Sequence, residues 1–200
     1  VIIDYFKNLK FQSKKYQNQN VLFDYSKKTE KIVIPKNISK WKVQMAFTGL
    51  DSNTGYRVFK IKKYINDKIF FLTYGDGVGK INIDKLLKFH KSHKKIATLT
   101  SVKPPSRFGE IVTKDNRVQF FSEKPQVNVG RINGGFFVFE KKFLKLIKDK
   151  SSILEKFPLE KATKLKNLFA YKHNGFWHCI DTKKDRDSVS MILKKKYLNH

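Results

Sequence analysis

The chain has 200 residues, a formal net charge of +26, 40% hydrophobic residues and 14% aromatic residues. This length predicts one domain with a sizeable core, and the hydrophobic content excludes a disordered chain. The single cysteine, Cys179, excludes an internal disulfide, and no run approaches the roughly 20 apolar residues that cross a bilayer.

The start of the chain bears on location. Val1-Ile2-Ile3-Asp4 has no basic flank ahead of an apolar run, so it predicts no secretory signal. Together with the lone thiol, this favours a cytoplasmic location. The opening also lacks a methionine, which indicates a chain that begins partway through a longer protein.

The positive charge allows two interpretations. Lysines are spread over the whole length and arginine is rare beside them, whereas specific nucleic-acid binders group both residues on one element. We therefore favour a general lysine bias, with no specific nucleic-acid partner. Polyanion binding is the alternative, which strongly salt-dependent, sequence-indifferent retention on DNA would support.

The first third of the chain predicts short elements between polar segments. A helix is expected over 1–10, and strands near 20–25, 32–34 and 41–47. A glycine-containing turn then leads into a helix over 54–65. The Thr48 hydroxyl, the Arg57 guanidinium and this helix N-terminus suit an anion or a nucleotide. Alternatively, Thr54 is simply the helix cap.

Residues 69–77 are the most informative stretch. The apolar, aromatic run 69–72 predicts a strand that is buried on both faces of a parallel sheet. Gly75-Asp76-Gly77 follows, and ligands bind beyond the carboxyl ends of strands in open α/β sheets. Asp76 is therefore a candidate metal or ligand contact, although an aspartate that only caps the turn fits equally well.

The middle of the chain predicts a helix over 83–93, a strand over 96–102, and a hairpin of 110–113 and 118–122. His90 and His93 could form a metal pair, but a solvated helix end is the favoured interpretation.

Two motifs follow the hairpin. Glu123 and Lys124 suit a sugar hydroxyl and a phosphate, or form only a surface ion pair. A strand over 132–139 is entered through Gly134 and Gly135, which suit either close backbone approach to a ligand or a bulge.

The last part predicts helices over 141–148, 158–165 and 183–197, with strands over 168–172 and 175–182. The second of these strands is aromatic and ends in Asp181, as the first aromatic strand ends near Asp76. Distant strands of a doubly wound sheet can present their ends to one crevice. Two carboxylates there suit Mg²⁺ bound together with substrate phosphates.

Five motifs in this order resemble the glucose-1-phosphate cytidylyltransferases, which belong to the sugar-phosphate nucleotidyltransferases. They are Leu72-Thr73-Tyr74-Gly75-Asp76-Gly77-Val78, Pro104-Pro105-Ser106-Arg107-Phe108-Gly109, Ser122-Glu123-Lys124-Pro125, Ile132-Asn133-Gly134-Gly135-Phe136 and Gly175-Phe176-Trp177 with Asp181-Thr182. The resemblance implies an α/β fold with a Rossmann-like mixed, mostly parallel sheet of the nucleotide-diphospho-sugar transferase type. It also implies that CMP is transferred from CTP to glucose 1-phosphate with Mg²⁺, which yields CDP-glucose and pyrophosphate for dideoxy-sugar and lipopolysaccharide O-antigen synthesis.

The resemblance also implies roles for single residues. Asp76 and Asp181 correspond to the magnesium ligands, and Lys124 to a catalytic, phosphate-binding cation. The nucleotide-binding positions are Thr48, Arg57 and Gly75, and the sugar-phosphate positions are Glu123, Lys124, Asn133 and Gly134. Family members commonly self-associate, so a homo-oligomer is expected.

The sequence departs from the family pattern at three places. The N-terminal strand and Gly-rich loop of the family have no counterpart, so we expect residues 1–200 to form a partial nucleotidyltransferase domain that is inactive alone. Tyr56 replaces a glycine, and His178-Cys179 differs from the usual pair. A transferase that uses UTP, dTTP or GTP, or a noncatalytic module of the same fold, remains an alternative. The coding DNA upstream of Val1 would distinguish a truncated enzyme from a module.

Overall fold

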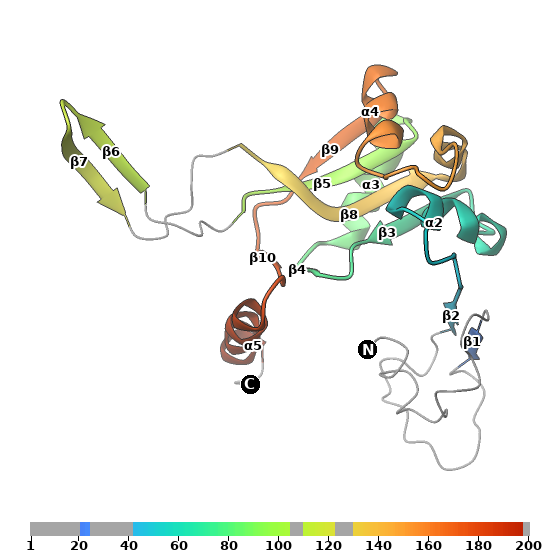
Figure 1. Cartoon of the computed structure of the whole chain (residues 1–200), viewed down its shortest axis with the longest axis horizontal. Helices are drawn as coiled ribbons and strands as arrows, with labels where there is room; N and C mark the ends of the chain where they lie inside the picture. Colours follow the sequence, from blue (N-terminus) through green and yellow to red (C-terminus); the bar gives the residue numbers. More distant parts are fainter. Residues whose placement is uncertain (1–20, 25–41, 105–109, 123–129, 198–200) are drawn as a thin grey trace, which may run out of the picture.

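The computed structural model describes residues 21–24, 42–104, 110–122 and 130–197 (Figure 1). The expected helix over 1–10, the run 32–34 and the Glu123-Lys124-Pro125 motif lie outside these residues. Among the described helices, none combines the length and the apolar character that a membrane span requires.

A four-stranded sheet forms the centre, in the order β3-β8-β5-β9. Its strands are β3 (Ile69–Thr73), β5 (Ala97–Val102), β8 (Ile132–Glu140) and β9 (Leu168–Lys172). Strand β8 runs antiparallel to β3 and β5, and β5 runs parallel to β9. Three strands thus share one direction, which confirms a mixed sheet. Their carboxyl ends and the start of β8 meet at one edge.

The prediction that β3 is buried on both faces is wrong. It is the outermost described strand of this sheet, and the Phe71 side chain is 45% exposed. Its neighbour β8 is also antiparallel. In this chain the continuous apolar run therefore forms an edge strand of the sheet. One face of the strand is covered, and the other is partly exposed to solvent.

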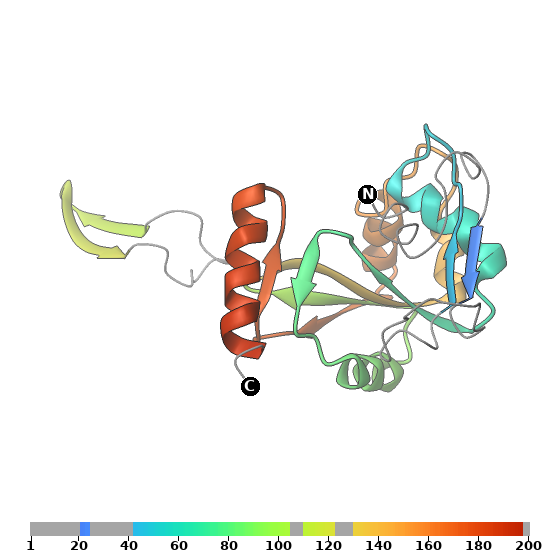
Figure 2. The same cartoon turned by 90° about the horizontal axis from the view of Figure 1, so that it is seen from below.

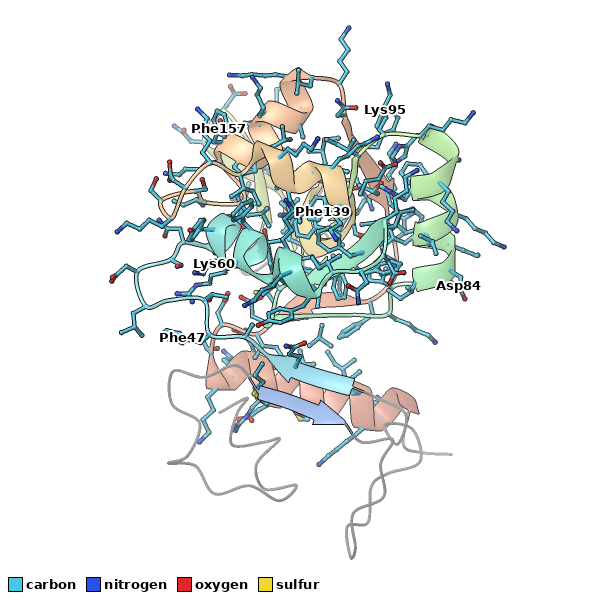
Figure 3. All side chains as sticks on the ribbon, turned by 90° about the vertical axis from the view of Figure 1, so that its right-hand side faces the viewer. Phe47, Lys60, Asp84, Lys95, Phe139 and Phe157 are labelled. Carbon is cyan, nitrogen blue, oxygen red and sulfur yellow. The ribbon has the colours of Figure 1, made fainter. Side chains whose placement is uncertain are left out.

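Aromatic side chains fill the core on one face of the sheet. The Phe139 ring stacks on that of Phe143 with 4.0 Å between centroids, and on that of Phe137 with 5.3 Å. All three are fully buried, and Phe139 lies inside the body formed by the central sheet and its helices (Figure 3). The helices that cover this face are the 3₁₀ helix η3 (Lys141–Leu146) and α4 (Phe157–Lys164).

Helix α2 (Thr54–Lys60), which continues as the 3₁₀ helix η2 (Ile61–Tyr64), packs beside this core through Val58. The predicted helix over 54–65 is thus present, with a tighter last turn.

Helix α3 (Ile83–His93) covers the opposite face, so the sheet lies between two helical layers (Figure 2). His90 is 1% exposed, and its Nδ1 lies 2.8 Å from Thr98 Oγ1. His93 Nε2 lies 2.7 Å from the same hydroxyl, and its ring stacks on Phe169. The expectation of a solvated helix end is therefore wrong, because both rings pack against the sheet.

We expect the free energy of unfolding to fall as the pH drops from about 6.5 to about 4. Burial, followed by the neighbouring His93, lowers the pKa of His90 to about 4, so the unfolded chain takes up a proton that the folded chain does not. The difference from the ordinary value corresponds to about 3 kcal/mol. Burial also lowers the pKa of His93, which adds to the loss in the same direction.

Urea unfolding at a series of pH values measures this slope. His90→Asn should flatten it, whereas His173→Asn, which leaves the contact between α3 and the sheet intact, should retain it. A wild-type slope in His90→Asn would show that His90 does not cause the acid sensitivity.

Three further units lie at the periphery. Strands β6 (Glu110–Lys114) and β7 (Arg117–Ser122) form the predicted hairpin, which projects from the body (Figure 1). Its turn residues Asp115 and Asn116 have φ values of 49° and 62°, as a two-residue type I′ turn requires. Strands β1 (Val21–Asp24) and β2 (Lys42–Met45) pair antiparallel, and α5 (Lys183–Tyr197) ends the described chain.

Candidate functional site

A cleft of about 710 Å³ opens at the edge of the sheet where β3 ends and β8 begins. It is lined by residues that follow β3 and β5, by the start of β8, and by the segment from β10 (Trp177–Cys179) into the first turns of α5. They include Tyr74, Asp76, Gly77, Pro104, Ile132, Asn133, Gly134, Trp177, His178, Cys179, Asp181, Thr182, Lys184, Asp185 and Ser188. Sequence-distant segments thus form one concave surface, the usual setting of a ligand site.

A short two-stranded ribbon brings the two predicted metal ligands together. Strands β4 (Gly77–Gly79) and β10 (Trp177–Cys179) pair antiparallel, and the Ile180 amide donates a 2.9 Å hydrogen bond to the Asp76 carbonyl. The prediction of a strand over 175–182 is therefore wrong in extent. The strand has three residues and pairs with β4, which sequence reasoning missed.

The ribbon creates a cluster of three possible metal ligands. A carboxylate oxygen of Asp76, one of Asp181 and the Cys179 sulfur all lie within 4.8 Å of one another. Both carboxylates are exposed to the cleft. Two hard oxygen donors fit Mg²⁺, which takes one or two carboxylates and fills its remaining positions with water and phosphate.

The start of α5 holds Asp181 in place. The Thr182 amide donates to Asp185 Oδ2 at 2.9 Å, and the Asp185 amide donates to Thr182 Oγ1 at 3.1 Å. This reciprocal pair is a capping box, with aspartate in the third position. The Asp181 amide donates to the same Asp185 oxygen at 3.2 Å, so the cap also orients the residue before it.

The paired glycines of β8 form a bulge at the wall of the cleft. The pairing between β5 and β8 shifts register between Leu99 and Ser101, opposite Gly134 and Gly135, and Gly135 has a φ of 75°. Trp177 Nε1 donates to the Gly134 carbonyl at 2.8 Å. Of the two interpretations of these glycines, the bulge is confirmed. The contact with a sugar phosphate stays a prediction.

We expect Gly134→Ala to lower the free energy of unfolding by about 1–3 kcal/mol. A methyl group at this position would lie 2.7 Å from Val102 Cγ1 and 3.1 Å from the Thr100 carbonyl, so β5 or β8 must shift. Gly75→Ala is the matched control, since a methyl group there has no atom within 4 Å. Urea unfolding of both variants checks this, and equal stabilities would contradict the close approach.

A polar network that sequence reasoning missed connects the cleft to α2. The Tyr74 hydroxyl is hydrogen-bonded to Glu155 Oε1, and Asn133 Nδ2 donates to it at 3.1 Å. The Thr54 hydroxyl donates to Glu155 Oε2 at 3.2 Å. Burial, followed by the contact with Glu155, raises the pKa of Tyr74 well above its ordinary value, so the phenol stays protonated. Asn133 also accepts from the Gly135 amide at 3.0 Å, and thus braces the bulge.

Two of the predicted nucleotide residues, Thr48 and Arg57, lie together apart from the cleft. Arg57 Nη1 donates to Thr48 Oγ1 at 2.9 Å, and Nη2 donates to the Leu50 carbonyl at 3.2 Å. Neither Thr48 nor Arg57 is among the residues that line the cleft, and neither is Gly75. Their contact with a nucleotide stays a prediction.

Thr54 does not cap α2, contrary to the simpler interpretation. The cap position is occupied by Asn53, while Thr54 Oγ1 accepts from the Leu154 amide at 3.0 Å.

Two of the predicted sugar-phosphate residues, Glu123 and Lys124, lie outside the described residues.

Arg131 is another residue that sequence reasoning missed. Its Nε donates to Ser101 Oγ at 3.0 Å, and its Nη1 donates to Asn174 Oδ1 at 2.9 Å. It thereby ties the end of β5 to the turn that leads into β10. No local pattern marks it, because its partners lie 30 and 43 residues away.

Comparison with known proteins agrees with this architecture. HddC from Yersinia pseudotuberculosis superposes with a TM-score of 0.51 over 71% of this chain and 63% of that structure, at 20% identity. Such a likeness concerns the fold, which is the expected nucleotide-diphospho-sugar transferase type.

Sequence comparison reaches further. Glucose-1-phosphate cytidylyltransferase of Salmonella typhimurium is 39% identical over 161 residues, which cover 80% of this chain. This chain spans 63% of the length of that relative. Mannose-1-phosphate guanyltransferase beta-B of Xenopus laevis is 33% identical over 125 residues, 60% of this chain and 35% of that protein. The family model "Nucleotidyl transferase" matches residues 12–185. The chain therefore belongs to the nucleotidyl transferase family.

Proposed function

We propose that this chain forms the metal and sugar-phosphate part of a glucose-1-phosphate cytidylyltransferase. Such an enzyme transfers CMP from CTP to glucose 1-phosphate and releases pyrophosphate. The observation that carries the proposal is the meeting of Asp76 and Asp181 in one cleft, with ligand oxygens within 4.8 Å. The 39% identity to the Salmonella enzyme supports the choice of substrates.

The charge of the cleft supports the need for a divalent ion. Its lining carries the carboxylates of Asp76, Asp181 and Asp185 against the ammonium of Lys184, although the whole chain has a net charge of +26. These carboxylates would repel phosphates, and a divalent cation between the two would remove that repulsion. The surrounding positive field would raise the local concentration of anionic substrates.

In the proposed reaction, a phosphate oxygen of glucose 1-phosphate attacks the α-phosphorus of CTP in line, and pyrophosphate leaves. The protein has little covalent chemistry to perform, and its contribution is positioning and charge neutralisation. When bound, Mg²⁺ would neutralise charge that develops on the phosphate oxygens. Asp76 and Asp181 would hold this ion, and Trp177 and the bulge at Gly134 would form the wall beside it.

The remaining roles rest on the family resemblance. Lys124 would neutralise the sugar phosphate, and Glu123 would bind sugar hydroxyls beside Asn133 and Gly134. Thr48, Arg57 and Gly75 would contact the nucleotide. A cytoplasmic location, a role in O-antigen synthesis and self-association are proposed on the same ground.

A nucleotide panel tests the proposal. The product of the complete reading frame is incubated with glucose 1-phosphate, Mg²⁺ and each of CTP, UTP, dTTP and GTP, and pyrophosphate release is measured. CTP should give the highest kcat/KM, and EDTA should stop turnover. Preference for another nucleotide would overturn the assignment of CTP. Lack of turnover with all four would indicate a noncatalytic module and overturn the enzymatic assignment.

A further inference from the structure

Cys179 adds a donor of different chemistry to the carboxylate pair. Its sulfur lies 3.3 Å from Asp181 Oδ1 and within 4.8 Å of the Asp76 ligand oxygen. In the ribbon, Cys179 is directly opposite Gly77, which has no side chain to occupy the shared face. The thiol therefore belongs to the same cluster as the two carboxylates.

This donor set suits two classes of cation differently. Mg²⁺ prefers an all-oxygen shell, whereas Zn²⁺ and Cd²⁺ accept thiolates readily. Tetrahedral zinc with Zn–S near 2.3 Å and Zn–O near 2.1 Å separates its ligand atoms by roughly 3.4–3.6 Å. The sulfur and the Asp181 oxygen are already near that spacing, and the third donor needs a side-chain shift on the order of 1 Å.

We propose that Cys179 is a third ligand at this site, which thereby binds a thiophilic divalent cation in competition with Mg²⁺. This inference rests on the proposed function only in naming Mg²⁺ as the competitor. On binding, the S–H bond of Cys179 breaks, a bond from sulfur to the metal forms, and the proton passes to solvent. No electron transfer takes place.

Cadmium titration of the 200-residue chain tests this directly. Cys179 is the only cysteine, so an ultraviolet charge-transfer band from thiolate to Cd²⁺ can come only from this residue. The wild-type chain should develop the band up to one equivalent of Cd²⁺, and excess Mg²⁺ should shift the titration to higher Cd²⁺ concentrations. Cys179→Ser should remove the band.

The carboxylate variants separate a built site from a simple exposed thiol. Asp76→Asn and Asp181→Asn should each weaken Cd²⁺ binding by at least about tenfold, since loss of even an outer-shell partner costs that much. Asp84→Asn is the matched control, because this exposed aspartate of α3 does not line the cleft. Its titration should match the wild type.

Three results would overturn the inference: no band in the wild-type chain, a titration that Mg²⁺ does not affect, or equal titrations of the wild type and both carboxylate variants. The band does not depend on turnover, so the two proposals fail separately. A wild-type band, together with no CDP-glucose formation by the product of the complete reading frame, would contradict the proposed enzyme and leave the cation site standing. An active enzyme without the band would contradict the thiophilic cation site and leave the proposed enzyme standing.

Discussion

Asp76→Asn and Asp181→Asn should each lower kcat/KM for pyrophosphate release at least about 100-fold, because each removes one anionic ligand from the ion that neutralises the phosphates. Both side chains are exposed to the cleft, so their replacement should leave the free energy of unfolding nearly unchanged. The measurement is steady-state kinetics of the product of the complete reading frame with CTP, glucose 1-phosphate and varied Mg²⁺.

Asp84→Asn serves as the control for charge alone, since it makes the same change on the surface of α3 (Figure 3). It should retain wild-type kinetics. If either cleft variant kept wild-type turnover at every Mg²⁺ concentration, the metal assignment would be wrong.

Phe139→Ala should lower the free energy of unfolding by about 3–5 kcal/mol, the usual cost of removing a fully buried aromatic ring. Phe139 is stacked between Phe137 and Phe143, and all three are 0% exposed. The cavity would open where β8 meets the helical layer of η3 and α4. Urea unfolding at neutral pH measures the loss.

Phe71→Ala is the matched control, because Phe71 belongs to the adjacent strand β3 but is 45% exposed. It should cost about 1 kcal/mol or less. Similar losses in the two variants would show that the face of the sheet with Phe139 is not the main core.

Local patterns in the sequence predicted most of the elements. The predicted helices over 83–93 and 183–197 and the strand over 168–172 match α3, α5 and β9 residue for residue. The hairpin of β6 and β7 was also predicted, since its turn residues favour positive φ. Periodicity and turn chemistry act over a few residues, so they can be read without knowledge of the fold.

The packing of individual faces could not be predicted in the same way. The apolar run of β3 predicts a fully buried strand, but Phe71 is half-exposed. The sequence around His90 predicts a solvated helix end, but His90 is buried against Thr98. In both cases the outcome depends on which element covers the face, and that information lies elsewhere in the chain.

The proximity of two candidate site residues was predictable, but the way the fold achieves it was not. Asp76 and Asp181 were predicted as a pair, and the structure brings them together. The three-residue pairing of β4 and β10 brings the two aspartates together. This pairing is too short to leave a clear pattern in the sequence. Glu155 was missed because its partners Tyr74 and Thr54 are 81 and 101 residues away.

Binding of Mn²⁺ to the 200-residue chain, followed by electron paramagnetic resonance of the free ion, tests the metal site most directly. Mn²⁺ favours the same oxygen ligands as Mg²⁺, and the titration requires neither turnover nor a nucleotide. The wild-type chain and Asp84→Asn should remove free Mn²⁺ equally. Asp76→Asn and Asp181→Asn should both leave more of it in solution. Equal binding by all four proteins would contradict a metal site shared by Asp76 and Asp181.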